Sequence, residues 1–525
     1  MATLARMWVR LVAVLAALAV AASAYVLTKP TAPPPAAQTS TESPSPEGPL
    51  APAPEQPERK KTASAPREAP SGRETTQPSP PPPPAPIETT QGAGELRAAS
   101  RLARIARRAK VGGRLGIAVF DGNGRSVFGH QAGVALLPAS TQKLAVAGAA
   151  LARFGPQHRY TTTVTTTSAP NRRGVLKGNL VIVGGGDPAL AQPDFGAVEP
   201  DRPRTPLERL ATGIKRAGIR RIKGRLLADP SFLAQEPVAA GWPPRYFEYL
   251  DATRITGLTV DAGRRLYRSG GLLQADAADD PAVRCAEVLR RLLRERGVKV
   301  VGGTGLTDGG GRTGATVASV SSPQLGVLLR YMVQRSDNHL ADTIFRTIGA
   351  STGDSTWVGA AAATAQFLAP LRLDWSGVVL ADGSGLSRAN RVSPAFLAQL
   401  QSHLWSSNLH DQWIQLLAVS GRTGTLRSRF LGTAAEQRVY GKTGSLRDVS
   451  ALVGTVAGTE GRLLHFAIVG NGLASTTRMR EVTDASVLAM AEEIQDCRRV
   501  QRPPRVRGKG KQRTVQRFPV RLVCD

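Results

Sequence analysis

The chain has 525 residues, of which 41% are apolar and 21% are charged. A chain of this length and apolar content can bury more than one core, which excludes a protein that is disordered throughout. Its formal net charge of +28 at pH 7 predicts attraction to polyanions.

Residues 1–28 have the pattern of an export signal. Arg6 and Arg10 precede an apolar run over 11–22, and Ala22-Ser23-Ala24 has the small-x-small form of a cleavage site. The apolar stretch continues beyond this point, so the segment also fits an uncleaved membrane anchor, for which about 20 apolar residues are needed. Both interpretations predict an extracytoplasmic protein, in the periplasm or cell wall, that is secreted or membrane-anchored.

Residues 29–92 are rich in Pro, Ala, Ser and Thr and include an unbroken run of prolines at 80–84. Such a segment cannot bury enough apolar surface to offset its chain entropy. It is predicted to be a disordered linker.

Residues 93–159 are expected to begin the main folded domain. A helix is predicted over 95–110, and a strand followed by Asp-Gly-Asn-Gly predicts a hairpin that starts at 115. Ser140 comes just before an Ala- and Leu-rich helix over 144–153, so it is expected at a helix start.

Residues 160–319 have a different pattern of predicted elements from that of the segment before them. Short β-rich pieces alternate with two amphipathic helices, near 206–217 and 281–296. This pattern predicts an inserted α+β domain.

Residues 320–496 are expected to complete the main domain. Ser322 resembles the N-cap of a helix that begins at Pro323, and two strand patterns precede a closing helix over 478–495. Together with 93–159, this segment predicts an α+β fold in which an antiparallel sheet is flanked by helices.

Residues 497–525 form a strongly basic tail. This tail fits either contact with an anionic wall polymer or membrane surface, or an ordinary solvated segment; nucleic acid is not an expected partner of an exported protein. Cys497 and Cys524 are the expected pair for one disulfide. Cys285 falls within a helical pattern and is expected to be a buried apolar residue.

Three short motifs occur in order: Ser140-x-x-Lys143, Ser336-Asp337-Asn338 and Lys442-Thr443-Gly444. Taken singly, they have ordinary explanations as a capping serine, an interhelical turn and a strand end with a glycine bulge. Together they match the motif set of serine β-lactamases and penicillin-binding proteins.

The spacing of the first motif has a physical reason. Positions i and i+3 of a helix lie on one face, so the Lys143 amine is expected near the Ser140 hydroxyl. At a reference pKa near 10.4, under about a thousandth of a lysine is neutral at pH 7, so a lysine base needs a pKa roughly 2 to 3 below that value. Burial and repulsion from Lys442 would both lower it. We therefore expect Lys143 to deprotonate Ser140, and Ser336 to relay a proton to the leaving amine.

With these motifs, residues 95–495 resemble the peptidase S13 family of D-alanyl-D-alanine carboxypeptidases/endopeptidases, the class C low-molecular-mass penicillin-binding proteins. The resemblance also rests on three glycine-containing segments, at 176–188, 382–388 and 420–426. The gap between the first two motifs is shorter than is usual in the family, as if a smaller nested domain were absent after Asp261.

The resemblance implies a penicillin-binding/β-lactamase-like transpeptidase domain with an inserted α+β domain. It implies a serine-type carboxypeptidase that cleaves peptidoglycan stem peptides through an acyl-enzyme on Ser140 and is inhibited by penicillins and other β-lactams. No cofactor and no metal are implied.

The resemblance also implies roles for the remaining motif residues. Asn338 would bind the substrate backbone, and Thr443 with Lys442 would bind the terminal carboxylate. The N–H groups of Ser140 and Ser445 would form the oxyanion hole. The implied substrate-binding set is completed by Asp337 and Gly444.

Two other functions fit the sequence less well. A non-catalytic wall-binding scaffold would not need the intact motifs, and a serine β-lactamase or esterase usually has its second motif much nearer the first. Carboxypeptidase or endopeptidase preference, stem-peptide specificity and oligomeric state are left open by the sequence.

Overall fold

The computed structural model of the protein describes residues 92–307 and 310–495, and four short strands between 498 and 523. The expected export signal and linker, and the expected Cys497–Cys524 pair, lie outside the described residues. In the described part of the chain, no helix combines the length and the apolar character needed to cross a bilayer.

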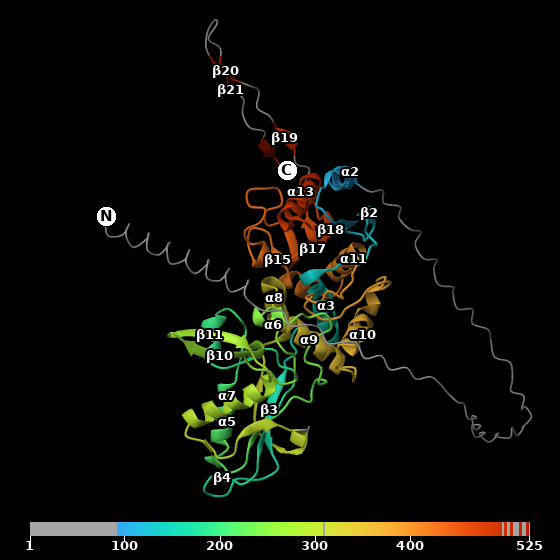
Figure 1. The fold of residues 1–525 in the computed structure, drawn as a ribbon. Coiled ribbons are helices and arrows are strands. Elements are labelled where there is room, and N and C mark those ends of the chain that lie inside the picture. Colours follow the sequence, from blue (N-terminus) through green and yellow to red (C-terminus); the bar gives the residue numbers. More distant parts are fainter. Residues whose placement is uncertain are drawn as a thin grey trace, which may run out of the picture. The chain divides into compact units, whose positions relative to one another are not determined.

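The main domain is built on a six-stranded antiparallel sheet (Figure 1). In spatial order its strands are β15 (Ala418–Val419), β16 (Val439–Leu446), β17 (Val449–Ala457), β18 (Leu463–Asn471), β1 (Arg114–Asp121) and β2 (Ser126–His130). Strand β1 pairs with β18 along its full length of 8 residues. The two ends of the folded chain therefore meet in one sheet, and β1 with β2 forms the predicted hairpin.

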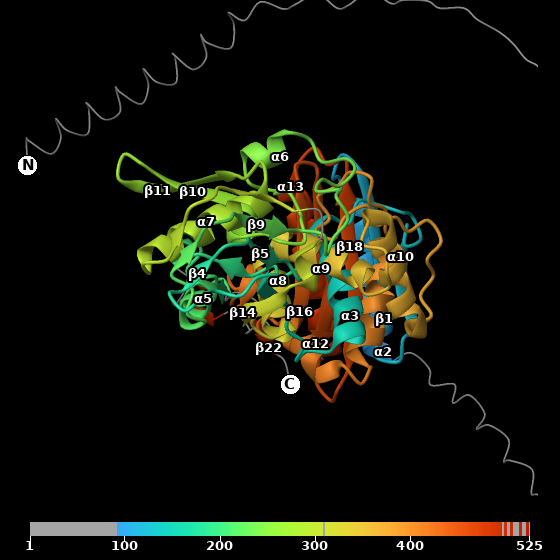
Figure 2. The ribbon, with the colours of Figure 1, turned by 90° about the horizontal axis from the view of Figure 1, so that it is seen from below.

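Helices cover both faces of this sheet. Helices α2 (Ala93–Arg108) and α13 (Thr476–Ile494) pack on one face. The other core contains α3 (Lys143–Phe154), α8 (Leu325–Arg335), α9 (Asn338–Ala350), α10 (Trp357–Leu368), α11 (Pro394–Trp405) and α12 (His410–Leu416). The predicted antiparallel sheet flanked by helices is confirmed, and in Figure 2 α3 lies beside β16 and β1.

The alternation of side chains along β1 explains why both faces are apolar. Ile117 and Val119 are buried with α2 and α13, whereas Ala118 and Phe120 are buried with α3 and α11. Successive side chains of a strand point to opposite faces. The sequence of a strand that is covered on both faces is therefore a continuous run of apolar residues.

The predicted start of helix α8 is wrong. The helix begins at Leu325 with Gln324 as its N-cap, and Ser322 has another function. The Ser322 hydroxyl accepts the Tyr160 N–H at 3.0 Å and donates to the Pro323 carbonyl at 2.7 Å. Ser322 therefore joins the two chain segments that flank the insertion.

The inserted segment has a mixed sheet of its own. In spatial order its strands are β13 (Thr304–Leu306), β9 (Leu226–Asp229), β5 (Leu180–Val183), β3 (Thr161–Thr166) and β14 (Ala315–Ser321). Helices α5 (Glu208–Arg216) and α7 (Pro281–Glu295) pack beside it. Cys285 of α7 is fully buried among apolar side chains, as predicted.

Smaller helices and strands, besides single 3-10 turns, also occur in the described chain. In the inserted segment these are β4 (Val175–Leu176), β6 (Leu190–Ala191), α4 (Phe195–Val198), β7 (Thr205–Pro206), β8 (Arg221–Ile222), α6 (Arg245–Glu248), β10 (Arg264–Ser269), β11 (Leu272–Ala277) and β12 (Lys299–Val300). The C-terminal segment contains the antiparallel pairs β19 (Arg498–Val500) with β22 (Arg521–Val523), and β20 (Arg505–Arg507) with β21 (Thr514–Gln516).

One stretch of the inserted segment packs on the main domain. Leu233, Trp242, Tyr246 and Ile255 are buried in the same cluster as α3 and α9. The inserted segment therefore contributes to two cores, and its predicted limits of 160 and 319 stay a prediction.

Candidate active site

Ser140 lies in a single 3-10 turn, η1 (Ala139–Gln142), that runs directly into α3. Ala139, just before it, has a φ of 47°, in the left-handed region that non-glycine residues seldom adopt. Lys143 is the first residue of α3 and is fully buried. Its Nζ lies 2.8 Å from the Ser140 Oγ, so the predicted contact between the two residues of the first motif is present.

The Lys143 amine has three oxygen neighbours. Besides Ser140, these are the Asn338 side-chain oxygen at 2.9 Å and the Ser384 carbonyl at 2.7 Å. Burial lowers the pKa of Lys143 to about 8, although the carboxylates of Asp342 and Asp382 act in the opposite direction. This pKa lies in the range that a lysine base requires.

The predicted repulsion between the two lysines acts on Lys442. Burial, followed by the nearby charge of Lys143, lowers the pKa of Lys442 well below its usual value. For Lys143, burial is the cause that lowers the pKa. Desolvation of a cation favours the neutral amine.

The second motif joins α8 to α9. Ser336 ends α8 in the left-handed conformation, with φ 62°, and Asp337 caps α9 by accepting the Leu340 N–H at 2.8 Å. The Asn338 amide donates to the Asp251 carbonyl at 2.8 Å while its oxygen faces Lys143. Asn338 thus connects the lysine of the first motif to the inserted segment.

The inserted segment also holds Asp337. Arg202 is buried and forms an ion pair with the Asp337 carboxylate. A pocket of about 340 Å³ beside this ion pair is lined by residues of both segments, including Asp251, Ser336 and Asn338. The position of the second motif therefore depends on the insertion.

The third motif lies inside strand β16, which pairs with β17 in unbroken register. The interpretation of this motif as a strand end with a bulge is therefore wrong. Lys442 is fully buried, and its Nζ donates to the Ser336 Oγ at 2.8 Å and the Thr443 carbonyl at 2.7 Å. The Thr443 hydroxyl donates to Thr425 at 2.9 Å.

Gly444 allows this strand to pass close to the turn that holds Ser140. A side-chain carbon added there would lie 2.8 Å from the Pro138 carbonyl oxygen, too close for an unstrained contact. Ser445 follows on the same strand and is exposed. The three motifs are therefore brought together: Lys143 contacts Ser140 and Asn338, and Lys442 contacts Ser336.

Sequence reasoning missed the supporting function of the loop that contains Ser384. Asp382 accepts hydrogen bonds from the Gly385 N–H at 2.8 Å and from the Trp242 indole at 2.8 Å. Asp342 accepts the Ser384 N–H at 2.7 Å, and burial raises the pKa of Asp342 well above its usual value. The Asp-Gly-Ser-Gly run marks a tight loop, but Trp242 and Asp342, two of its hydrogen-bond partners, lie far away in the sequence.

Gly385 shows why this loop needs glycine. Its φ is 84°, and a side-chain carbon there would collide with the Ala139 carbonyl oxygen. The loop therefore packs directly beneath the residue that precedes Ser140.

The chain matches the D-Ala-D-Ala carboxypeptidase 3 (S13) family over residues 98–270 and 268–493. It is 30% identical over 451 residues to a D-alanyl-D-alanine carboxypeptidase of Actinomadura sp. strain R39, covering 72% of this chain and 81% of that protein. It is also 30% identical to the carboxypeptidase DacB of Mycolicibacterium smegmatis, covering 71% of this chain and 78% of the relative.

Among solved structures, the fold is similar to that of penicillin binding protein 4 from Haemophilus influenzae. The TM-score is 0.64 at 20% identity, covering 73% of this chain and 98% of that structure. The same protein complexed with a novel β-lactam gives a TM-score of 0.59 at 21% identity, with 74% and 98% covered.

Proposed function

Because the chain belongs to the D-Ala-D-Ala carboxypeptidase 3 (S13) family, we propose that it is a serine-type D-alanyl-D-alanine carboxypeptidase that cleaves peptidoglycan stem peptides through Ser140. The observation that carries this proposal is the 2.8 Å contact between the Ser140 hydroxyl and a buried lysine whose pKa is lowered to about 8. A neutral amine beside a hydroxyl is the arrangement of a base with its nucleophile.

In the proposed first half-reaction, the neutral amine of Lys143 takes the Ser140 proton as Oγ attacks the carbonyl carbon of the penultimate D-alanine. The peptide bond breaks, an ester forms on Ser140, and the terminal D-alanine leaves as an amine. The proton that Lys143 accepted passes to this leaving nitrogen through Ser336, whose hydroxyl lies 2.8 Å from the Lys442 Nζ, so Lys143 is neutral again. Water then hydrolyses the ester, and its proton returns through Lys143.

Substrate binding is assigned to the residues that surround this centre. We expect Lys442 and Thr443 to bind the terminal carboxylate, because a negative charge there would stabilise the charged form of the buried Lys442. Asn338 is expected to bind the peptide backbone, and the N–H groups of Ser140 and Ser445 to stabilise the oxyanion. A β-lactam would acylate the same Ser140 oxygen.

The location of the activity is part of the proposal. Peptidoglycan is extracytoplasmic, and the relatives that the chain resembles are named as carboxypeptidases. We propose that residues 1–28 direct or anchor the protein outside the cytoplasm, and that the basic tail contacts an anionic surface there.

The test is intact-mass analysis of the full chain after exposure to benzylpenicillin, with Ser140→Ala as the matched control. An adduct of one penicillin on the parent and none on the variant is expected. No adduct on the folded parent would favour a non-catalytic scaffold. Rapid penicillin hydrolysis without a lasting adduct would identify a β-lactamase instead.

A further inference from the structure

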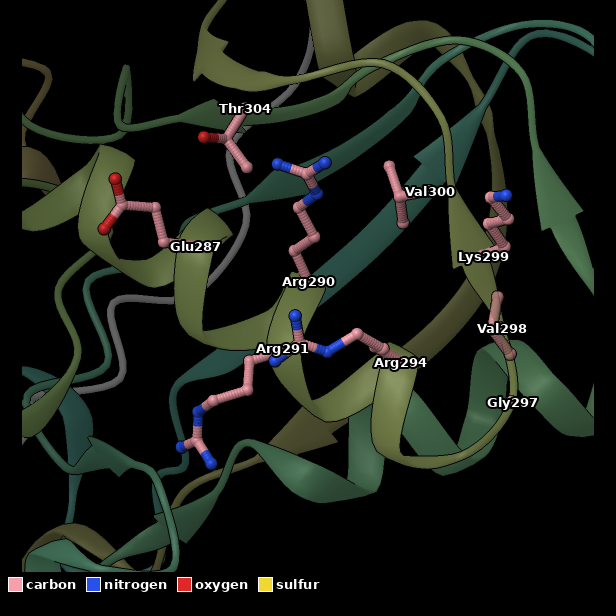
Figure 3. A pocket seen from close by; sticks show the side chains of 9 residues that line it. All are labelled: Glu287, Arg290, Arg291, Arg294, Gly297, Val298, Lys299, Val300 and Thr304. Atoms are coloured by element: carbon pink, nitrogen blue, oxygen red, sulfur yellow. The ribbon is translucent and has the colours of Figure 1, made fainter.

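A second concave surface lies on the inserted segment, and none of the residues that line it belongs to the three motifs. This groove, of about 660 Å³, lies between α7 and the chain from Gly297 to Thr304, which contains β12. Figure 3 shows the Arg290 side chain extending from α7 toward Thr304 across the groove.

The groove carries an excess of positive charge. Four cationic side chains line it and one acidic side chain does, Glu287, which is bound to Arg284 at 3.2 Å outside the groove. Arg291 is paired with Glu295 at 2.8 Å. Within the described part of the chain, the side chains of Arg290, Arg294 and Lys299 form no hydrogen bond or ion pair, and all three are exposed.

Folding of the segment does not account for these three cations. Helix α7 is held by its opposite face, where Leu289, Leu292 and Leu293 are buried. Arg290 and Arg294 are four residues apart on one helix face, where like charges repel each other. Arg294 lies in the last turn of α7, where a cation is favourable, but none of the three cations gains an ion-pair partner among the described residues.

The shape of the groove restricts what can bind there. Val298 and Val300 are buried and form an apolar floor between the helix and the strand. A groove walled on two sides fits a chain-like molecule better than a flat bilayer surface. Cations spaced one helical turn apart, about 5.4 Å, can contact successive anionic groups, and guanidinium groups bind phosphate oxygens in a bidentate manner.

We propose that this groove binds a linear phosphodiester polymer of the cell wall and so tethers the enzyme near its substrate. The proposal rests on the proposed function, because a peptidoglycan carboxypeptidase works among anionic wall polymers. Arg290, Arg294 and Lys299 supply the charges that bind the phosphate groups.

The test measures binding of the full-length chain to fluorescent poly(glycerol phosphate) as a function of salt. The variant Arg290→Gln/Arg294→Gln/Lys299→Gln removes three groove charges. The control Arg209→Gln/Lys215→Gln/Arg216→Gln removes three exposed charges from neighbouring helix α5. The groove variant is expected to bind at least tenfold more weakly, with a shallower salt dependence, and the control less than threefold more weakly.

Equal weakening in both variants would overturn the proposal, because the polymer would then be held by net charge alone. So would equally tight binding of polyglutamate, which carries carboxylates and no phosphate. Groove-dependent binding to phosphatidylglycerol vesicles without polymer binding would assign the surface to a membrane. Penicillin acylation of the groove variant is expected to be unchanged, so a failure of the binding proposal and a failure of the catalytic proposal are separate results.

Discussion

The catalytic centre and the α7 groove use cationic side chains in opposite ways. Lys143 and Lys442 are fully buried, and each has oxygen neighbours within 2.9 Å. Arg290, Arg294 and Lys299 are exposed and have no such neighbours among the described residues. Burial lowers the pKa of Lys143 to about 8, which suits a base, whereas two of the three groove cations are arginines, a residue type that does not act as a base in proteins. The two sites therefore differ both in burial and in residue type.

The largest effect is expected from a variant that removes the buried base. Lys143→Met should lower the rate constant for acylation by benzylpenicillin by about 10³-fold, because general-base catalysis contributes typically 10²- to 10⁴-fold. Stopped-flow or mass-spectrometric kinetics measure this loss. The thermal unfolding midpoint is expected to fall, because the Asn338 side-chain oxygen and the Ser384 carbonyl lose their donor, so the rate is compared at a temperature where both proteins are folded. A folded variant that keeps its acylation rate would contradict the assignment.

The second test uses pH. If the neutral amine of Lys143 is the base, with a pKa of about 8, the neutral fraction rises with pH and levels off above that pKa. Acylation at pH 8 should then be about 50 times faster than at pH 6, since each unit below the pKa costs about tenfold. Polymer binding in the groove should stay constant over this range, because its arginines remain charged. An acylation rate that does not change between pH 6 and pH 8 would contradict the assignment of Lys143 as the base.

A third test targets the contact between the inserted segment and the second motif. Arg202→Met leaves the Asp337 carboxylate without its buried partner, so the Ser336–Asn338 loop should shift. We expect kcat for a D-alanyl-D-alanine peptide to fall by roughly 10-fold, as expected for misplacement of a catalytic group, with a smaller change in KM. Arg202→Lys should restore part of kcat. An equal fall in the Asp337→Asn variant, with no further loss in the double variant, would show that both residues act through one ion pair.

The smallest expected effect comes from a neighbouring exposed ion pair. Arg335 pairs with Asp201 at 2.6 Å, but the two side chains are 47% and 71% exposed. Arg335→Gln should change kcat less than twofold and the free energy of unfolding by less than about 1 kcal/mol, as is usual for surface pairs. Urea unfolding provides the measurement. A loss of kcat as large as that of Arg202→Met would mean that any nearby positive charge, and not the burial of the Arg202–Asp337 ion pair, positions the Ser336–Asn338 loop.

The sequence predicted much of this molecule, and the failures have physical causes. The Ser140–Lys143 contact was predictable because it is set by local helix geometry, and β1 and β2 because strand and turn patterns are local. The start of α8 was missed because Ser322 binds Tyr160, a partner 162 positions away. The Trp242–Asp382 hydrogen bond and the Arg202–Asp337 ion pair were missed for the same reason, since no spacing rule specifies contacts between distant segments.

The pairing of β3 with β14 has an evolutionary consequence. Both ends of the insertion leave the main sheet region as adjacent antiparallel strands, so length changes between them need not open the catalytic domain. The short hairpin of β10 and β11 follows Asp261, where the family resemblance suggests that a nested domain is missing. Trp242 and its neighbours, in contrast, are tied to the catalytic domain, because the Trp242 indole donates to Asp382 in the loop that packs against Ala139.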